Sequence, residues 1–268
     1  MSSGKPSPLT LKVTQDLRRT LEGEPSADRL ALALRHLAKW RTHLIAETLQ
    51  AKSGDTVLSG PFKGMKYGVR ASEGTRSARL IGCFEASLAP VVEAIIARAY
   101  PLVIDVGSAE GYYAVGLARR MPGSRVMARD DNPFAQKLCA ELAAMNGVAD
   151  RVQIGGRMEP ADFGICAAQD SVVICDIEGA EQDLLDPDRA PGLRHADILV
   201  ECHEGMRPGL TAAIMHRFRA THAVTRIERR IDDSGLPGWM HGISDMDRLL
   251  AMWEWRAGPT PWLWMVRR

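Results

Sequence analysis

The chain has 268 residues, of which 46% are hydrophobic and 25% are charged, a balance typical of a globular protein large enough for one sizeable domain plus an appendage. Its 34 basic and 33 acidic residues nearly cancel, so no overall field draws it to nucleic acid or to an anionic membrane. No uninterrupted apolar run approaches about 18 residues and the five cysteines lack CxxC spacing, so we expect no membrane span, disulfide framework or zinc site, and a cytoplasmic location.

The first part of the chain is predicted to be mainly helical. Apolar residues recur at helical spacing over residues 9–21 and 26–52, which indicates two helices. Glycine, serine and proline then interrupt the pattern over residues 53–76, where we expect loops with two short extended segments. A third helix is expected over residues 86–99. We therefore divide the chain into an N-terminal helical extension, residues 1–60, and a main domain, residues 61–268.

From residue 102 onward, short apolar strands alternate with helices. The predicted strands cover 102–106, 125–129, 152–154, 172–175, 198–202, 224–229 and 262–266, and the predicted helices cover 113–120, 133–145, 160–166, 180–185 and 210–219. Strands rich in valine and isoleucine that alternate with helices are typical of a parallel sheet covered on both faces. The last two strands are expected to form an antiparallel edge. The predicted fold class is α/β, a Rossmann-like, doubly wound, mostly parallel seven-stranded sheet with an N-terminal helical extension.

The strand at 102–106 leads into the turn DVGSAEG (105–111), which opens a helix. Glycines let the backbone approach a ligand closely, and a helix N-terminus offers unpaired N–H groups. The spacing is not that of the dinucleotide fingerprint GxGxxG, because Ala109 holds the middle position and Gly111 comes one residue early. A NAD-dependent oxidoreductase is therefore disfavoured. The alternative to a ligand-binding turn is a strand–turn–helix with a purely structural role.

The next strand ends in acidic residues. Asp130 follows Gly111 by nineteen residues, and in nucleoside-binding sheets an acid about 20 residues after the glycine turn accepts hydrogen bonds from ribose hydroxyls. Asp130 is the candidate for that role and Asp131 is the adjacent alternative. Asn132, just before Pro133, suits the N-cap of a helix, and both roles are compatible.

These features together resemble the class I S-adenosylmethionine (SAM)-dependent methyltransferases. D-x-G-x-A-x-G resembles their motif I, and the "NG" at 146–147 resembles the end of their second helix. The sequences DIEGAE (176–181) and LVExH (199–203) are similar to the FkbM-type branch, whose members mostly methylate hydroxyls of sugars, polyketides and other small molecules. The resemblance covers residues 85–204. It implies SAM as the cofactor and S-adenosylhomocysteine as the product.

The resemblance and the strand-end positions together give a set of candidate cofactor-binding residues. They are Glu85, Asp105, Gly107, Ser108, Ala109, Gly111, Tyr112, Asp130, Asp131, Asn132, Arg157 and Asp176. Glu85 resembles the acid that often precedes motif I. Arg157 falls where these enzymes usually contact adenine, but the family often has an acid there, so this position departs from the pattern.

Polar residues at the ends of the fourth and fifth strands are the catalytic candidates: Asp176, Glu201 and His203. Ligands of such sheets sit beyond the carboxyl ends of the strands. His203 titrates near neutrality, so we expect it to act as general base with help from Asp176, with a structural histidine as the alternative. Asp176, Glu201 and His203 are also candidate ligands for Mg²⁺ or another divalent ion, which would acidify an acceptor hydroxyl.

The predicted function is transfer of a methyl group from SAM to a hydroxyl of a small molecule, with neither a nucleic acid nor a membrane as partner. Methylation of an amine, a carbon atom, RNA or protein is an alternative. A DNA amino-methyltransferase is disfavoured because the Asn/Asp-Pro-Pro-aromatic signature of many such enzymes is absent: Asp176 is followed by Ile-Glu-Gly. A SAM-binding module without activity is the non-enzymatic alternative. The N-terminal helices are expected to cover the cofactor mouth or to pair two subunits in a homodimer.

Overall fold

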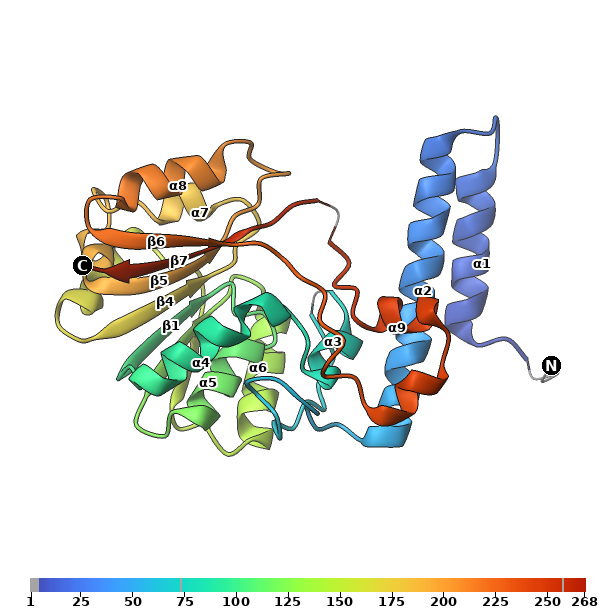
Figure 1. Cartoon of the computed structure of the whole chain (residues 1–268), viewed down its shortest axis with the longest axis horizontal. Coiled ribbons are helices and arrows are strands. Elements are labelled where there is room, and N and C mark those ends of the chain that lie inside the picture. The colour runs from blue at the N-terminus through green and yellow to red at the C-terminus, as the bar shows by residue number, and fades with distance from the viewer. Residues whose placement is uncertain (1–4, 73, 257) are drawn as a thin grey trace.

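A seven-stranded sheet forms the centre of the computed structural model, which describes residues 5–72, 74–256 and 258–268 (Figure 1). The strands are β1 (Leu102–Val106), β2 (Arg125–Arg129), β3 (Val152–Gly155), β4 (Ser171–Cys175), β5 (Ala196–Glu201), β6 (His222–Ile227) and β7 (Trp262–Arg267). Their order is β3-β2-β1-β4-β5-β7-β6. The first five are parallel, and β7 runs antiparallel to both β5 and β6. The predicted fold class and its antiparallel edge are confirmed.

Helices cover both faces of this sheet (Figure 1). On one face lie α4 (Ala89–Arg98), α5 (Tyr112–Arg120) and α6 (Pro133–Met145). On the other lie α7 (Glu181–Leu184), α8 (Leu210–Phe218) and the 3-10 segments η2 (Pro160–Ala167) and η3 (Pro191–His195). Successive side chains of a strand point to opposite faces of the sheet, so they pack in different cores. Val103 belongs to the apolar cluster on one face and Ile104 to the cluster on the other.

The N-terminal helices α1 (Pro8–Leu21) and α2 (Ala27–Ser53) form a hairpin that stands to one side of the sheet (Figure 1). Only the second half of α2 joins the main core, where Ile45 and Leu49 are buried. Residues 55–69 add further buried side chains to the same core. The division of the chain at residue 60 stays a prediction. Residues on both sides of that position contribute side chains to the same core.

Short helical segments lie outside the predicted helices: α3 (Arg76–Ile81), η4 (Gly238–Gly242) and α9 (Asp245–Ala251). The helix predicted over residues 86–99 starts with a 3-10 turn, η1 (Ala86–Leu88), before α4. α9 packs on α2, and its Asp247 carboxylate accepts two hydrogen bonds from Arg41 at 2.7 and 2.6 Å. A helix of two turns carries too little periodicity to stand out in the sequence, so tertiary contacts decide its existence.

One stretch, Arg76–Arg98, is long and apolar enough by length and composition to cross a membrane, with a mean hydropathy of 1.8. The criterion of uninterrupted apolar runs misses this stretch, because it contains Glu85 and Glu93. The structure divides the stretch into α3, η1 and α4, and Gly82 ends α3 in the left-handed region at φ 88°. Leu80, Val92 and Ile95 are fully buried in the main core, the arrangement of core helices.

Gly82 should tolerate no side chain. An added Cβ would lie 2.0 Å from the carbonyl oxygen of Ser59, in a backbone conformation that L-residues rarely adopt. We expect Gly82→Ala to lower the free energy of unfolding by at least about 2 kcal/mol, measured by chemical denaturation. Gly123→Ala is the control, since an added Cβ meets nothing within 4 Å there, and a change within about 0.5 kcal/mol is expected. Equal effects of the two would contradict the tight Gly82–Ser59 contact.

Candidate active site

A cavity of about 590 Å³ opens at the carboxyl ends of β1, β2 and β4. The strand order reverses between β1 and β4, because the chain continues to one side through β2 and β3 and to the other through β4 and β5. Such a reversal leaves a crevice at the carboxyl edge of the sheet, where α/β proteins of this type bind their ligands.

The turn after β1 is held tightly between the neighbouring strands. The Gly107 N–H donates to the carbonyl of Arg129 at the end of β2 at 2.8 Å. On the other side, a Cβ at Gly107 would lie 1.7 Å from the carbonyl oxygen of Asp176 at the end of β4. Gly111 begins α5 at φ 91°, and a Cβ there would lie 2.6 Å from Cys139. Gly107 therefore lets the ends of β1 and β4 approach each other, and Gly111 lets the start of α5 approach α6.

Asp130 organises the rim of the cavity at the end of β2. Its carboxylate accepts a hydrogen bond from the Ala109 N–H and another from the Asn132 N–H, both at 2.8 Å. Asn132 in turn caps α6, as its Oδ1 accepts from the Phe134 N–H at 2.9 Å. Asp130 thus links the glycine turn to the start of α6 while facing the cavity. Asp131 is exposed on the rim.

Asp105 is a buried carboxyl in the cavity wall, with 3% of its surface exposed. Burial raises its pKa to about 7. Among the described residues, Asp105 Oδ2, Ser108 Oγ and Asp176 Oδ1 are buried atoms without a hydrogen-bond partner, and all three residues line the cavity. Unpartnered buried polar atoms are costly, so three of them around one cavity indicate a polar ligand there.

Glu110, from the same turn, is fully buried and paired. Its carboxylate lies 2.9 Å from Arg79 Nε and accepts hydrogen bonds from Tyr67 Oη at 2.6 Å and from the Ser72 N–H at 2.9 Å. Burial disfavours the charged form, but these partners hold the pKa of Glu110 below its ordinary value. These contacts hold Tyr67, Ser72 and Arg79 against the turn, and Arg79 forms part of the cavity wall beside it.

His203 lies behind the cavity wall, with 5% of its surface exposed. Its Nδ1 lies 2.7 Å from Glu181 Oε1, while its Nε2 lies 3.6 Å from Asp176 and 3.3 Å from Glu178, which both line the cavity. Burial disfavours the imidazolium, but the hydrogen bond to Glu181 and the charges of Asp176 and Glu181 outweigh it and raise the pKa of His203. A carboxylate on Nδ1 fixes the ring and leaves Nε2 directed at the cavity side.

Arg256 holds together a second group of buried carboxylates. Its guanidinium contacts Glu85 and Glu201 and lies 3.0 Å from Glu254. Glu85 also accepts from Tyr113 Oη at 2.5 Å, and burial raises the pKa of Glu85 to about 7 against the attraction of Arg256. The side chain of Glu85 therefore faces this cluster and a small neighbouring pocket, not the main cavity.

Among the residues that the structure describes, two sets of three side chains bring their ligand atoms within 4.8 Å of one another: Asp176 with Glu178 and His203, and Asp176 with Glu85 and Glu201. Arg256 already forms ion pairs with two members of the second set, Glu85 and Glu201. The first has two carboxylates and an imidazole, donors that suit a divalent ion. The predicted metal ligands are close together, since His203 Nε2 lies 3.8 Å from Glu201 and 3.6 Å from Asp176.

Aromatic side chains form another wall of the cavity: Phe84, Tyr112, Tyr113 and Trp262. Neighbouring rings pack edge to face, with centroids 5.6 Å apart for Phe84 and Tyr112 and 5.7 Å for Tyr112 and Tyr113. At the far end, beyond β3, the cavity is lined by Arg157, Met158, Glu159 and Pro160. One end is thus aromatic beside Asp176, and the other lies at the rim near Asp130.

The structure brings ten of the predicted site residues to the cavity: Asp105, Gly107, Ser108, Ala109, Tyr112, Asp130, Asp131, Asn132, Arg157 and Asp176. Four do not line it: Glu85, Gly111, Glu201 and His203. Sequence reasoning missed Glu181 and Arg256 as members of the site. Glu181 stands in the quoted DIEGAE sequence and had a signal, whereas Arg256, in the last loop, had none.

No protein-family model matches the chain, and no curated protein does. Among solved structures, it is similar to an O-methyltransferase from Bacillus cereus in complex with S-adenosylhomocysteine (TM-score 0.45, 10% identity, 96% of this chain and 97% of the other). It is also similar to cofactor-bound Rv0187 from MTB (0.45, 15%, 98% and 98%) and to human methyltransferase 10 domain containing protein (0.47, 12%, 85% and 97%). These likenesses are too distant to decide a function, which must come from the site itself.

Replacing the buried carboxyl Asp105 should stabilise the protein in a pH-dependent way. A folded pKa near 7, above the ordinary value of 3.8, means that the native state holds the proton more tightly. Stability is therefore lost as pH rises from about 4 to 7, by at most about 4 kcal/mol. We expect Asp105→Asn to raise the melting temperature at pH 8 and to leave it nearly unchanged at pH 4. Asp131→Asn, on the exposed rim, is the control; a pH-independent effect of Asp105→Asn would contradict the assignment.

Proposed function

We propose that this protein is a SAM-dependent methyltransferase that methylates a hydroxyl group of a small molecule. One observation carries the proposal above the others: three unpartnered buried polar atoms, from Asp105, Ser108 and Asp176, surround a cavity at the reversal of the strand order. That is where an α/β sheet of this order binds a nucleoside ligand.

The charge of the cavity favours a cationic cofactor. Eight acidic side chains and four arginines line it. Among the arginines, Arg79 is paired with Glu110, and Arg129 donates to the carbonyl of Gln153 at 2.9 Å. SAM carries a sulfonium and an ammonium group, which such a surface attracts, whereas the pyrophosphate of NAD would be repelled. This distinction supports SAM independently of the glycine spacing.

The residues present fit the parts of that cofactor. Asp130, at the end of β2 and facing the cavity, would accept hydrogen bonds from the ribose hydroxyls. Asp105 Oδ2 is a buried acceptor without a partner among the described residues, and an ammonium group would satisfy it. Met158 and Pro160 offer apolar surface at the β3 end, and Arg157 stands there as the departure from the family pattern.

When bound, SAM supplies an electrophilic methyl group on its sulfonium sulfur. The protein's part is to position the acceptor and to move one proton. Asp176 lines the cavity and would accept a hydrogen bond from the acceptor hydroxyl. His203 Nε2, 3.6 Å behind that carboxylate, would take the proton, and Glu181 on Nδ1 would stabilise the imidazolium formed.

A divalent ion is a second way to acidify the hydroxyl. Asp176, Glu178 and His203 offer oxygen and imidazole donors within 4.8 Å of one another and would hold it, with Glu201 close by but engaged by Arg256. Its chemistry would be to lower the pKa of a coordinated hydroxyl. Chelation followed by return of Mg²⁺ distinguishes this arrangement from the metal-free one.

A cationic amine is the second candidate for the acceptor. Carboxylates of Asp176 and Glu178 beside an aromatic wall that includes Tyr113 and Trp262 suit an ammonium group on a flat apolar body. In that case the His203–Glu181 pair would remove a proton from the ammonium group before transfer. A screen of phenols, sugars and amines, read by S-adenosylhomocysteine formation, separates O- from N-methylation.

Calorimetric titration tests the cofactor. We expect SAM and S-adenosylhomocysteine to bind and NAD not to bind, because the cavity is acidic. Asp130→Ala should weaken binding of both SAM-derived ligands by about tenfold to a hundredfold, equivalent to one or two lost hydrogen bonds to a charged acceptor. Asp131→Ala is the matched control and should change affinity little. Binding of NAD alone would overturn the proposal, and unchanged affinity in Asp130→Ala would remove the ribose assignment.

Turnover tests the proton-transfer residues. With an acceptor found by the screen, His203→Ala should lower the turnover number about 10²- to 10⁴-fold while SAM affinity changes little. Glu181→Gln should also lower turnover, because it removes the charge that holds the ring and stabilises its protonated form. His195→Ala, at the exposed opposite end of β5, is the control. Equal losses of turnover and SAM affinity in His203→Ala would instead indicate a structural histidine.

A further inference from the structure

Three carboxylates gather at the wall of the cavity beside Asp176. Oxygen atoms of Glu85, Asp176 and Glu201 lie within 4.8 Å of one another. The side chains of Glu85 and Glu201 are 3% and 2% exposed, whereas that of Asp176 is 37% exposed and lines the cavity. His203 Nε2 lies 3.6 Å from Asp176 and 3.8 Å from Glu201, beyond hydrogen-bond distance. Negative charges this close repel one another strongly away from water, so the group needs a cation in direct contact.

The guanidinium of Arg256 supplies this cation. It forms ion pairs with Glu85 and Glu201 and lies 3.0 Å from Glu254, with 17% of the arginine side chain exposed. Arg256 lies on the small neighbouring pocket, together with Glu85 and Glu254. It therefore engages two of the three gathered carboxylates on the side of that pocket, and the third, Asp176, faces the main cavity.

The backbone that carries Arg256 into this position is held in an unfavourable conformation. Trp255 has a φ of 66°, in the left-handed region, which a bulky side chain rarely adopts. Such a conformation persists only where surrounding contacts impose it. Residues 253–256 belong to neither a helix nor a strand, so the contacts that impose it come from another part of the chain.

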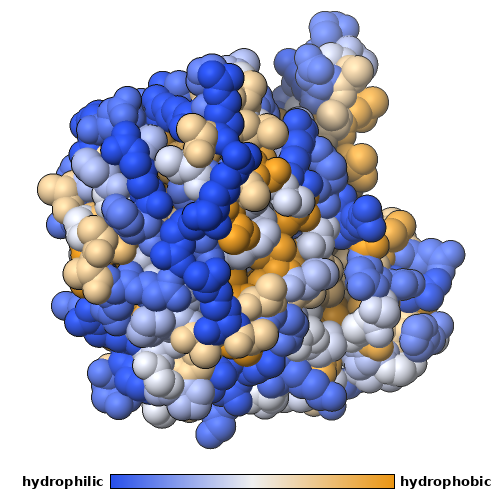
Figure 2. Space-filling view, turned by 60° about the vertical axis from the view of Figure 1, so that its left-hand side comes forward, coloured by the Kyte–Doolittle hydropathy of each residue, from blue (hydrophilic) through white to orange (hydrophobic). Residues whose placement is uncertain are grey.

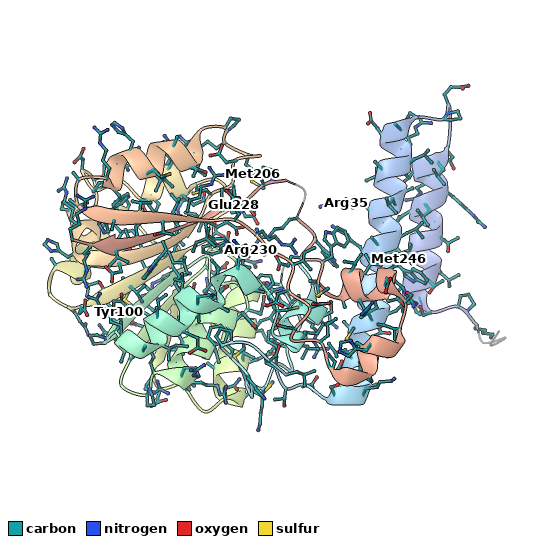
Figure 3. All side chains as sticks on the ribbon, viewed as in Figure 1. Arg35, Tyr100, Met206, Glu228, Arg230 and Met246 are labelled. Carbon is teal, nitrogen blue, oxygen red and sulfur yellow. The ribbon has the colours of Figure 1, made fainter. Side chains whose placement is uncertain are left out.

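Helix α2, in the hairpin that projects at the upper right of Figure 2, supplies these contacts. The Trp255 indole N–H donates to Thr42 Oγ1 at 3.1 Å, and Lys39 Nζ lies 4.7 Å from the ring centroid. The His43 ring packs edge to face on the same indole, with centroids 5.4 Å apart. Arg35 donates to the Trp255 carbonyl oxygen, and Figure 3 shows Arg35 directed from α2 toward the body of the protein. Four side chains of one helix thus hold this one residue.

We propose that Arg256 is a positioning residue of the candidate active site and that α2 holds it in place through Trp255. With the guanidinium between them, Glu85 and Glu201 stay buried and the Asp176 carboxylate stays at the cavity, where it would bind the acceptor hydroxyl. Without the guanidinium, repulsion would displace Asp176, the most exposed of the three. The role of Asp176 rests on the proposed function, whereas the role of Arg256 rests on the contacts alone.

Removal and restoration of the charge test the effect on turnover. With an acceptor found by the screen, Arg256→Met should lower the turnover number about 10- to 100-fold with little change in SAM affinity. Arg256→Lys, which keeps the charge, should lose less, and added methylguanidinium should restore part of the activity of Arg256→Met. Arg194→Met is the control, since Arg194 pairs with Asp188 at 2.6 Å near the start of β5, at the opposite edge of the sheet. Unchanged turnover in Arg256→Met would overturn the inference, whereas an inactive wild type would contradict the proposed function.

Calcium binding tests the role of Arg256 without any acceptor. Arg256→Met leaves three close carboxylates without their cation, and carboxylate oxygens are ligands that suit Ca²⁺. The melting temperature of Arg256→Met should lie below that of the wild type and should rise on addition of CaCl₂ more than that of the wild type or of Arg194→Met. The double variant Arg256→Met, Glu201→Gln should be more stable than Arg256→Met and should lose the added response to CaCl₂. No added response in Arg256→Met would overturn the inference, whether or not the protein methylates any acceptor.

A double-mutant cycle tests the part played by α2. Trp255→Gly removes the ring that α2 holds, and glycine adopts the left-handed φ at no steric cost. This variant should gain part of the response to CaCl₂ seen in Arg256→Met, and the two substitutions together should have little more effect than Arg256→Met alone, because both act through one guanidinium. Trp239→Gly is the matched control, since the Trp239 ring also lies against α2, 4.3 Å from Lys52 Nζ, and this variant should gain no response. Additive effects of Trp255→Gly and Arg256→Met would overturn the role of α2.

Discussion

The close approach of two strand ends determines the rest of this site. Gly107 lies so near the carbonyl of Asp176 that no side chain fits between them. This contact lets β1 and β4 end at the same level, and with them their terminal acids. Asp130, directly after β2, links the end of that strand to the turn by accepting a hydrogen bond from the Ala109 N–H. Because the crevice exists only where these backbones meet, the geometry of the cavity is decided by backbone contacts before any ligand-binding side chain is considered.

Gathering acids at one edge has an electrostatic cost that the chain offsets unevenly. Arg79 and hydrogen bonds hold the pKa of Glu110 below its ordinary value, whereas burial raises the pKa of Glu85 to about 7 although Arg256 contacts it. Asp105 has no cationic partner among the described residues, its Oδ2 accepts no hydrogen bond, and burial raises its pKa to about 7. Of the two carboxyls that line the cavity beside the glycine turn, Glu110 is thus paired with a cation and Asp105 is not. Strain of this kind at a cavity wall is what a bound cation would relieve, which is why function and stability oppose each other at Asp105.

Much of the fold could be predicted from the sequence, because strands such as Leu102–Val106 are continuous apolar runs and their helices have clear starts at Asn132 and Pro133. The strand-end acids could also be placed, since parallel strands share one carboxyl edge. The sequence could not show that Glu85 turns away toward Arg256, because that residue lies 171 positions further along the chain. Nor could it predict α9, whose two turns depend on Arg41 of a distant helix.

The hairpin and the candidate active site are connected through residues 253–256. This segment is not a strand, because Trp255 has a φ of 66°, in the left-handed region. Trp253 and Trp255 face α2, where Trp255 donates to Thr42 and lies beneath Lys39, while Glu254 and Arg256 face the site. Glu254 accepts from the backbone N–H of Glu85, and Arg256 contacts the Glu85 carboxylate. Helix α2 therefore contacts the same short segment that holds Arg256 against the buried acids, so the N-terminal helices and the candidate site are joined by packing and are not independent of each other.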